Sequence, residues 1–522
     1  MSQPVPPEES GTLDGAQLQD RAVRGVAWTM IHTVVSVPIA FAVNLLLARV
    51  LEPEGYGRLA FLTTLIGIAG GILALGLSSA MIQFGAKAHA SGRTDEVRGI
   101  LSSSQGFRLL VVAPVLTLLV IALVDVPTAL LILAIVFGVW VPAALDGGPI
   151  TLFIENKTDR SLEHGRIAMV SGLVVQAGVV AAALWAGTAD AVWAARVVLS
   201  AAGIALALLS IAPAYRRAVL RPRLPRHFPA GFWRFALPTG IAGLIGELVV
   251  SRTEVLFLNW LSTPTAVGLF ALAFGVSSHI FAPAQALTGP LIPAIAGLRE
   301  VGLDKVATAF GRALRASSTV VALLTAAALR HCALTVLVPV LYGHEYTDAA
   351  PAVLALGVIG GLAVASGPVS AFVLARLSAR VFLIANLCAL AIDVALALAL
   401  IPAFGLWGAV IANAAGTLTR LFILVGSEAR DLRLTFAATA AMVMPALVGG
   451  AACLLGWSAT LGTSLAPIVE ACLASLVALA LVLLGMRVTR SGLSPADTQT
   501  IVRVLPARLT RTARMALSLV TR

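Results

Sequence analysis

Charged residues are scarce in this 522-residue sequence. Asp, Glu, Lys and Arg make up only 12% of it, whereas 59% of the residues are hydrophobic, and soluble proteins carry about 25% charged residues. A chain with so little charge cannot cover its surface with groups that water solvates. This excludes a soluble enzyme and, despite a net charge of +11, a soluble protein that binds nucleic acid.

Cysteine and the common catalytic motifs are also scarce or absent. The four cysteines, Cys332, Cys388, Cys453 and Cys472, all lie inside apolar runs, where they are typical of small packing residues, so a disulfide scaffold is excluded. The sequence has no G-x-x-x-x-G-K-[ST] phosphate loop, no H-E-x-x-H motif and no Cys/His cluster. We therefore predict no catalytic residue, no metal ligand and no cofactor.

Long apolar runs are what the sequence does contain. They are of the length that a helix needs to cross a hydrocarbon core of about 30 Å, and we predict an all-α polytopic membrane protein with about fourteen spans. The N-terminus lacks the basic region and cleavage site of a secretory signal, so the first span is expected to be retained. The spans cover residues 26–48, 59–82, 109–124, 129–145, 168–187, 191–212, 236–259, 267–292, 317–341, 350–375, 381–401, 407–425, 435–457 and 465–486.

The distribution of Lys and Arg predicts the orientation, because basic loops stay on the cytoplasmic side. With the N-terminus inside, the inner segments carry 30 of the 36 basic residues, and the outer loops carry only Arg49 and Arg58. Both termini are therefore predicted to be cytoplasmic.

Residues 213–235 divide the chain. This segment contains six Arg and four Pro, which is typical of a linker. A weak internal repeat supports two units: L-E-P-E-G-Y-G-R-L-A (51–60) and L-S-T-P-T-A-V-G-L-F-A (261–271) both place a Pro-containing outer turn before a Gly and an apolar helix start. We predict two pseudosymmetric six-helix lobes plus two C-terminal helices.

The chain is thus predicted to have six parts. They are a disordered cytoplasmic tail (1–25), an N-lobe (26–212), the linker (213–235), a C-lobe (236–425), helices 13 and 14 (435–486) and a basic amphipathic cytoplasmic tail (487–522). The last is expected to lie on anionic lipid, with partner docking as the alternative.

Several runs resemble a known family. A-R-V-L-E-P-E-G-Y-G-R-L-A (48–60) and G-L-S-S-A-M-I-Q-F (76–84) are similar to the start of the bacterial polysaccharide exporters and O-antigen flippases, within the multidrug/oligosaccharidyl-lipid/polysaccharide superfamily. L-Y-G-H-E-Y-T-D-A-A-P (341–351) and the run over 385–413, with its I-P-x-x-G-x-x-G-A turn, resemble later helices of the same family. At Asp393 the family often has Asn.

The resemblance implies a flippase for surface polysaccharide, such as lipopolysaccharide O-antigen or exopolysaccharide. Its partner would be an oligosaccharide linked to a polyprenyl carrier, usually undecaprenyl pyrophosphate, and it would work by alternating access between the lobes in the bacterial inner membrane. The further partners that the resemblance implies are membrane lipid, a polymerase and other polysaccharide assembly proteins.

Polar residues inside spans are the candidates for binding such a substrate, because a charge facing lipid costs at least about 2.5 kcal/mol at a span centre. Arg252 and Arg330 are the main candidate cations for the pyrophosphate. Arg49 and Asn386 complete the predicted cavity. Each has a structural alternative: the two buried arginines could pair with buried acids, and Arg49 could reach the headgroup layer. Arg196 and Arg420, nearer to interfaces, carry less weight.

Buried acids are the candidates for coupling transport to H⁺ or Na⁺. Asp393, Glu247 and Glu254 all lie inside predicted spans. Glu247 and Glu254 are seven residues apart, as are Asn386 and Asp393, so each pair is predicted to share one helix face. Whether flipping is coupled at all stays open, because consumption of substrate on the far side could drive it.

Two other functions are alternatives to the flippase. A cation-coupled multidrug exporter of the same superfamily is the main alternative, and a negatively charged cavity would favour it. A membrane glycosyltransferase using Glu52 and Glu54 as an acid pair is disfavoured, because the short outer loops offer no domain to hold an acceptor.

The cavity hypothesis predicts the effect of two substitutions. Replacing Arg252 or Arg330 with Ala should reduce polysaccharide export without reducing membrane insertion, because a pyrophosphate-binding cation is lost. Measuring export together with the amount of inserted protein tests this prediction. Normal export by both variants would leave only a structural role for Arg252 and Arg330.

Overall fold

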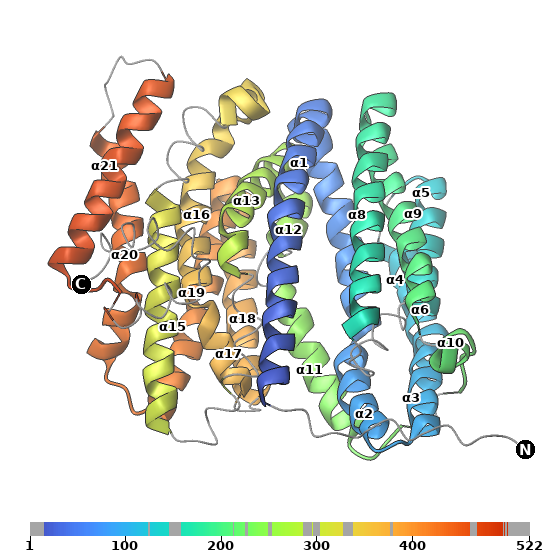
Figure 1. Ribbon diagram of the computed structural model, residues 1–522. Coiled ribbons are helices and arrows are strands. Elements are labelled where there is room, and N and C mark those ends of the chain that lie inside the picture. Colours follow the sequence, from blue (N-terminus) through green and yellow to red (C-terminus); the bar gives the residue numbers. More distant parts are fainter. Residues whose placement is uncertain are drawn as a thin grey trace, which may run out of the picture.

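The computed structural model describes most of the chain as a bundle of helices (Figure 1). It covers residues 15–123, 126–145, 158–211, 213–224, 228–248, 253–285, 303–326, 338–375, 379–459 and 467–493, with the single residues 295, 495 and 498. Arg252, Arg330 and most of the predicted C-terminal tail lie outside these described residues.

Every regular element in the described part of the chain is a helix. Ten helical segments there are long and apolar enough to cross a membrane. This confirms the prediction of an all-α polytopic membrane protein, while the predicted number of fourteen spans is not confirmed. Large apolar side chains cover the outside of the bundle: Leu118 is 68% exposed and Trp185 is 91% exposed. So much exposed apolar surface suits contact with lipid rather than with water.

The first element, α1 (Gly15–Ala74), is a hairpin of two helical arms. At Glu52 the backbone leaves the helical region, with φ 56° and ψ 173°. The ring of Pro53 explains the position of this break, because proline disfavours a helical conformation in the residue before it. The hairpin therefore turns at the Pro-containing motif that the sequence places between its first two spans.

The N-terminal half of the chain, from α1 to α10, forms the right side of the bundle in Figure 1. After α1 come α2 (Leu77–Ala90), α3 (Thr94–Phe107), the π-helical turn η1 (Arg108–Val112), α4 (Ala113–Leu123), α5 (Thr128–Leu133), the π-helical η2 (Ala134–Trp140), α6 (Val141–Leu145), α8 (Thr158–Ala186), α9 (Ala189–Ala207), the short 3₁₀ turn η3 (Leu208–Ser210) and α10 (Pro213–Leu220).

In the C-terminal half, α13 to α21 form the left side of the view, and α11 and α12 lie at its centre. The elements of this half are α11 (Phe232–Glu247), α12 (Thr253–Leu261), α13 (Pro264–Gln285), α15 (Leu303–Leu324), the 3₁₀ turn η7 (His344–Ala349), α16 (Ala350–Ala365), α17 (Gly367–Ala375), α18 (Ala379–Phe404), α19 (Leu406–Asp431), α20 (Phe436–Ala459) and α21 (Pro467–Val488).

The predicted span 109–124 starts too late. The helical path begins at Thr94 and runs through α3 and η1 into α4. Val97, Ile100 and Leu101 of α3 are buried, while Asp95 and Arg98 on the same helix are exposed. Because only one face of this first part is apolar, its average hydropathy is low and a search for continuous apolar runs misses it.

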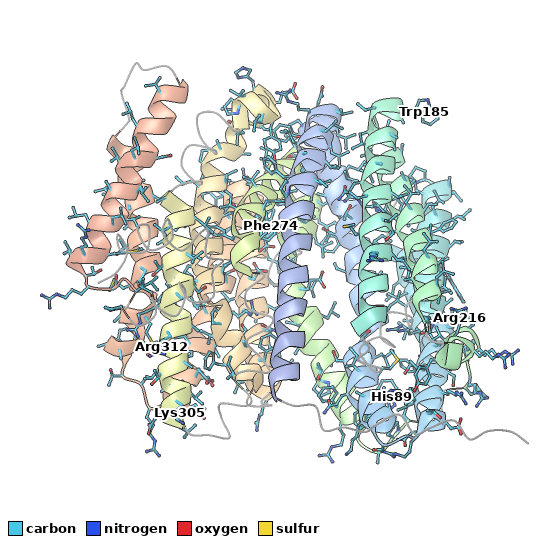
Figure 2. All side chains as sticks on the ribbon, in the orientation of Figure 1. His89, Trp185, Arg216, Phe274, Lys305 and Arg312 are labelled. Atoms are coloured by element: carbon cyan, nitrogen blue, oxygen red, sulfur yellow. The ribbon has the colours of Figure 1, made fainter. Side chains whose placement is uncertain are left out.

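The two ends of the bundle differ in charge (Figure 2). Trp185 lies at the end where α1 turns, which we call the hairpin end, whereas His89, Lys305 and Arg312 lie at the opposite end, which we call the basic end. Since basic loops stay cytoplasmic, the basic end is the predicted cytoplasmic end.

At the hairpin end the two halves touch backbone to backbone. A Cβ placed on Gly57 of α1 would lie 2.1 Å from the carbonyl oxygen of Pro264, and a Cβ placed on Gly268 of α13 would lie 1.9 Å from the carbonyl oxygen of Pro53. Each glycine follows its proline by four residues, so the contact is reciprocal. Only glycine permits this approach, and the two copies of the sequence repeat meet each other here.

A second close contact joins the halves at the basic end. Gly76, at the start of α2, has φ +70°, and a Cβ there would lie 1.9 Å from the carbonyl oxygen of Ala236 in α11. A Cβ on Gly240 of α11 would lie 2.4 Å from the backbone nitrogen of Gly76. The part of α1 between Gly57 and Gly76 is therefore held against the C-terminal half at both of its ends.

Adding one methyl group tests the contact at the hairpin end. Gly57→Ala should separate α1 from α13 and destabilise this closed arrangement by about 1–3 kcal/mol, the usual cost of overpacking. The expected result is a lower Tm and faster reaction of Thr63→Cys with a water-soluble maleimide. Gly70→Ala is the matched control, because a Cβ there meets nothing within 4 Å. Equal Tm and labelling rate for the two alanine variants would contradict the role of this contact.

Candidate functional site

Two adjoining cavities lie along the second arm of α1. One, of about 220 Å³, is bounded by Asn44, Tyr56 and Thr63 of α1 and by Val255, Phe270 and Phe274 of the C-terminal half. The other, of about 370 Å³, lies within the N-terminal half, and both cavities are lined by Thr63 and Arg196. We call the two together the chamber. It lies between the glycine contacts described above and near the middle of the bundle, where Figure 2 places Phe274.

Arg196 of α9 is the cation shared by both parts of the chamber. Tyr56 of α1 lines the first cavity together with it. A charge in the middle of an apolar helix is costly when it faces lipid, so its position on the chamber wall is the favourable one. From the sequence, Arg196 carries little weight as a candidate because it lies near the predicted start of its span, although its position inside a span marks it as a costly charge.

Arg108 is the second cation of the chamber. Its side chain lines the larger cavity and is 1% exposed. Nη1 donates to Gln105 Oε1 at 3.3 Å, and Nη2 donates to Ser78 Oγ at 3.1 Å. Arg108 is not among the candidates predicted from the sequence, because the third span is predicted to start after it; the helix in fact starts fourteen residues before Arg108, at Thr94.

The charge of the chamber is uniformly positive among its described lining residues. Arg108 and Arg196 contribute two guanidinium groups, and none of the described residues that line the two cavities is Asp or Glu. Hydroxyl and amide groups accompany them, from Asn44, Thr63 and Ser200. Such a surface can hold an anion by charge-assisted hydrogen bonds and can bind the hydroxyl groups of a sugar.

Two of the predicted coupling acids meet in the C-terminal half. Glu254 of α12 and Asp393 of α18 are both completely buried and interact with each other. Asn413 Nδ2 of α19 donates to Glu254 Oε1 at 2.6 Å. Gly416 lets α18 and α19 pack closely, because a Cβ there would lie 3.0 Å from Asp393 Cβ. We call Glu254 and Asp393 the carboxyl pair.

The carboxyl pair is short of hydrogen-bond donors. Neither oxygen of Asp393 and only one oxygen of Glu254 has a hydrogen bond from the described residues. Two buried carboxylates without such bonds are strongly unfavourable. The arrangement is therefore suited to hold a proton or a small cation such as Na⁺, for which carboxylate and amide oxygens are natural ligands.

Glu247 differs from the carboxyl pair in its burial. It is exposed at the last position of α11, whereas Glu254 is buried in α12. Residues 249–252 between them lie outside the described residues, so the expectation that Glu247 and Glu254 share one helix face stays a prediction.

Asn386 and Arg49 are not among the residues that line the chamber. Asn386 is buried and its Nδ2 donates to the carbonyl oxygen of Ala242 at 2.9 Å, which joins α18 to α11. The guanidinium of Arg49 donates to the carbonyl oxygens of Val340 and Leu341. Arg49 thus joins α1 to the chain before η7 at the hairpin end, where Tyr346 Oη also donates to the carbonyl oxygen of Ala48, at 2.9 Å.

Arg420, Glu52 and Glu54 are not among the described residues that line the chamber. The guanidinium carbon of Arg420 lies 5.5 Å from the centre of the Phe382 ring, and the side chain lines a separate cavity of about 100 Å³ that Asn413 also lines. Glu52 and Glu54 are exposed on the α1 turn, outside the chamber.

Several solved structures share this fold. The lipid II flippase MurJ in an inward closed conformation matches with a TM-score of 0.60 and 12% identity, over 88% of this chain and 98% of that chain. A MATE transporter in the bent conformation matches with a TM-score of 0.53 and 16% identity, over 81% and 99%. A transporter of the MOP superfamily from Pyrococcus furiosus matches with a TM-score of 0.52 and 16% identity, over 82% and 100%. No match was found among curated proteins.

The family itself is identified by a match over more than half of the chain. Residues 22–298, from α1 to beyond α13, match the family described as polysaccharide biosynthesis protein. The fold agrees with that of flippases and transporters of the MOP superfamily. The chain belongs to the polysaccharide biosynthesis protein family.

Proposed function

We propose that this protein is a flippase that moves a lipid-linked oligosaccharide, carried on undecaprenyl pyrophosphate, across the bacterial inner membrane for surface polysaccharide biosynthesis. The observation that carries the proposal is the chamber, whose smaller cavity is lined by both halves and whose larger cavity lies in the N-terminal half. It presents Arg108 and Arg196, and none of its described lining residues is acidic. A pyrophosphate and a sugar chain cannot enter hydrocarbon, so they need a polar, cationic path while the polyprenyl tail stays in lipid. Family membership and the fold shared with a lipid II flippase support the proposal.

Alternating access would use the two glycine contacts as its ends. In the proposed cycle, the N-lobe (26–212) and the C-lobe (236–425) first separate at the basic end, while the contact between Gly57 and Gly268 keeps the hairpin end closed. The lobes then close at the basic end and separate at the hairpin end. The substrate head would enter the chamber from the cytoplasm and leave on the outer side. Backbone contacts suit this exchange, because they form or break without rearranging side chains.

The carboxyl pair provides a means of coupling this motion to H⁺ or Na⁺. Glu254 belongs to the pair, and the next residue on α12, Val255, lines the chamber. A proton or Na⁺ on the pair changes how tightly α12 packs against α18 and α19. Because α12 also forms part of the chamber wall, occupancy of the pair biases the equilibrium between the two open states.

A cation-coupled multidrug exporter is the second candidate, since MATE transporters share the fold. The positive chamber disfavours it, because Arg108 and Arg196 would repel a cationic drug. The two functions make opposite predictions for the removal of one guanidinium group.

Arg196→Ala tests the substrate. A charge-assisted hydrogen bond contributes about 1.5–3 kcal/mol, so this variant should bind a polyprenyl-pyrophosphate saccharide at least roughly 10-fold more weakly and reduce surface polysaccharide. Arg196→Lys should restore part of the affinity. Arg93→Ala is the control, because Arg93 is exposed and pairs only locally with Glu96. Unchanged binding by the Arg196→Ala protein, with faster efflux of a cationic dye, would favour the multidrug exporter instead.

Asp393→Asn tests the coupling. This change keeps the shape of the side chain, removes its charge and restores the residue that the family often has. The variant should bind substrate normally, yet its transport in proteoliposomes should no longer depend on a H⁺ or Na⁺ gradient. Asp304→Asn serves as the matched control, because it makes the same change at an exposed position in the first turn of α15. If the Asp393→Asn protein keeps its gradient dependence, coupling does not pass through Asp393 and must be sought at Glu254 and Glu247.

A further inference from the structure

A basic groove lies at the basic end of the N-terminal half, separate from the chamber. It has a volume of about 500 Å³ and is bounded by Arg98 of α3, Arg217 of α10, and Arg221 and Arg223 in the segment after α10. One acid, Asp95, also lines it. None of its lining residues lines the chamber.

Specific packing holds α10 in place beside the groove. Tyr215 and Val219 are buried in the same apolar cluster as Ile100 and Leu101 of α3. The Tyr215 hydroxyl also lies 2.7 Å from His89 Nδ1 of α2, within hydrogen-bond distance. Burial of this face leaves Arg217 on the exposed side of α10.

The segment after α10 is fixed in register with α3. The backbone N–H of Arg223 donates to the carbonyl oxygen of Ser102 at 3.0 Å. Gly106 makes room for this segment, since a Cβ there would lie 1.7 Å from the Arg223 carbonyl oxygen. The backbone, rather than flexible side chains, therefore brings Arg221 and Arg223 beside Arg98.

Among the described residues, one ion pair compensates part of the positive charge in the groove. Arg98 pairs with Asp95 at 2.9 Å, but no described acidic side chain forms an ion pair with Arg217, Arg221 or Arg223. Guanidinium groups held together repel one another, and an anion with several oxygens relieves this repulsion through charge-assisted hydrogen bonds. Phosphate groups fit this requirement well.

Apolar side chains next to the arginines indicate that the phosphate belongs to a lipid. Leu220 and Leu224 flank the arginine segment and are 49% and 56% exposed. A free phosphate ion would make no use of them. Basic and apolar side chains exposed together are typical of a surface at the boundary between headgroups and acyl chains.

We propose that the basic groove binds the phosphate group of a membrane lipid in the leaflet at the basic end. Two lipids offer this chemistry: a bulk anionic phospholipid, and the polyprenyl pyrophosphate carrier. Binding of the polyprenyl pyrophosphate carrier would hold it next to the N-terminal half before its head enters the chamber. Only this role for the groove, as a site for the carrier, rests on the proposed function.

Binding to the purified full-length protein tests the proposal. The probes are phosphatidylglycerol and undecaprenyl pyrophosphate, each added to the protein in detergent and counted by native mass spectrometry, with phosphatidylcholine as the zwitterionic reference. The test variant is Arg221→Gln with Arg223→Gln, which keeps the backbone bond to Ser102. The control is Lys305→Gln with Arg312→Gln, which removes the same charge from α15 at the same end (Figure 2).

The groove variant should bind at least one anionic probe roughly 10- to 30-fold more weakly, because about 1 kcal/mol is lost for each arginine, while the control binds normally. Loss for phosphatidylglycerol identifies a phospholipid site, and loss for undecaprenyl pyrophosphate identifies a carrier site. Unchanged binding of both probes, or equal loss in the control, would overturn the proposal. If the double variant does not fold, Arg217→Gln answers the same question, since Arg217 lies outside the fixed segment. None of these measurements requires flipping, so they can fail or succeed independently of the proposed function.

Discussion

The contact between Gly57 and Gly268 sets the distance between the two halves of the molecule. Two backbones can approach this closely only where neither helix carries a Cβ, and the reciprocal spacing from Pro53 and Pro264 means that each half supplies the same element. The hydrogen bonds of Arg49 and Tyr346 across the hairpin end depend on that distance. So does the shape of the chamber, whose walls come from α1 on one side and from α12 and α13 on the other.

The arginines of the chamber and the carboxyl pair lie in different halves of the molecule. Arg108 and Arg196 lie in the N-terminal half, and the carboxyl pair lies in the C-terminal half. Had Arg196 packed against Asp393, each would have neutralised the other, and neither would be available to an external ion. The separation leaves one site suited to an anion and another suited to a cation, and α12 contributes Val255 to the first and Glu254 to the second.

Much of the fold could be predicted from the sequence, because apolar runs of membrane length leave few alternatives to helices. Asp393 and Glu254 could be selected as buried acids for the same reason, although only the fold shows that they meet. Arg108 escaped prediction because the amphipathic start of α3 does not look like a membrane helix. The roles of Arg49 and Asn386 depend on carbonyl groups of distant elements, Leu341 and Ala242, which no local pattern reveals. By contrast, the sequence shows the repeat of Pro and Gly in residues 51–60 and 261–271, but it does not show that these two segments contact each other.

The attachment of the linker to α3 also limits how far the halves can part. Arg223 is fixed to Ser102 in the N-terminal half, and Phe232 is buried at the start of α11. Nine peptide steps separate these two residues, and even a fully extended chain of that length spans no more than about 30 Å. The linker thus acts as a tether of fixed maximum length. Any opening between the halves is therefore bounded by the length of this segment, as well as by the shape of the chamber.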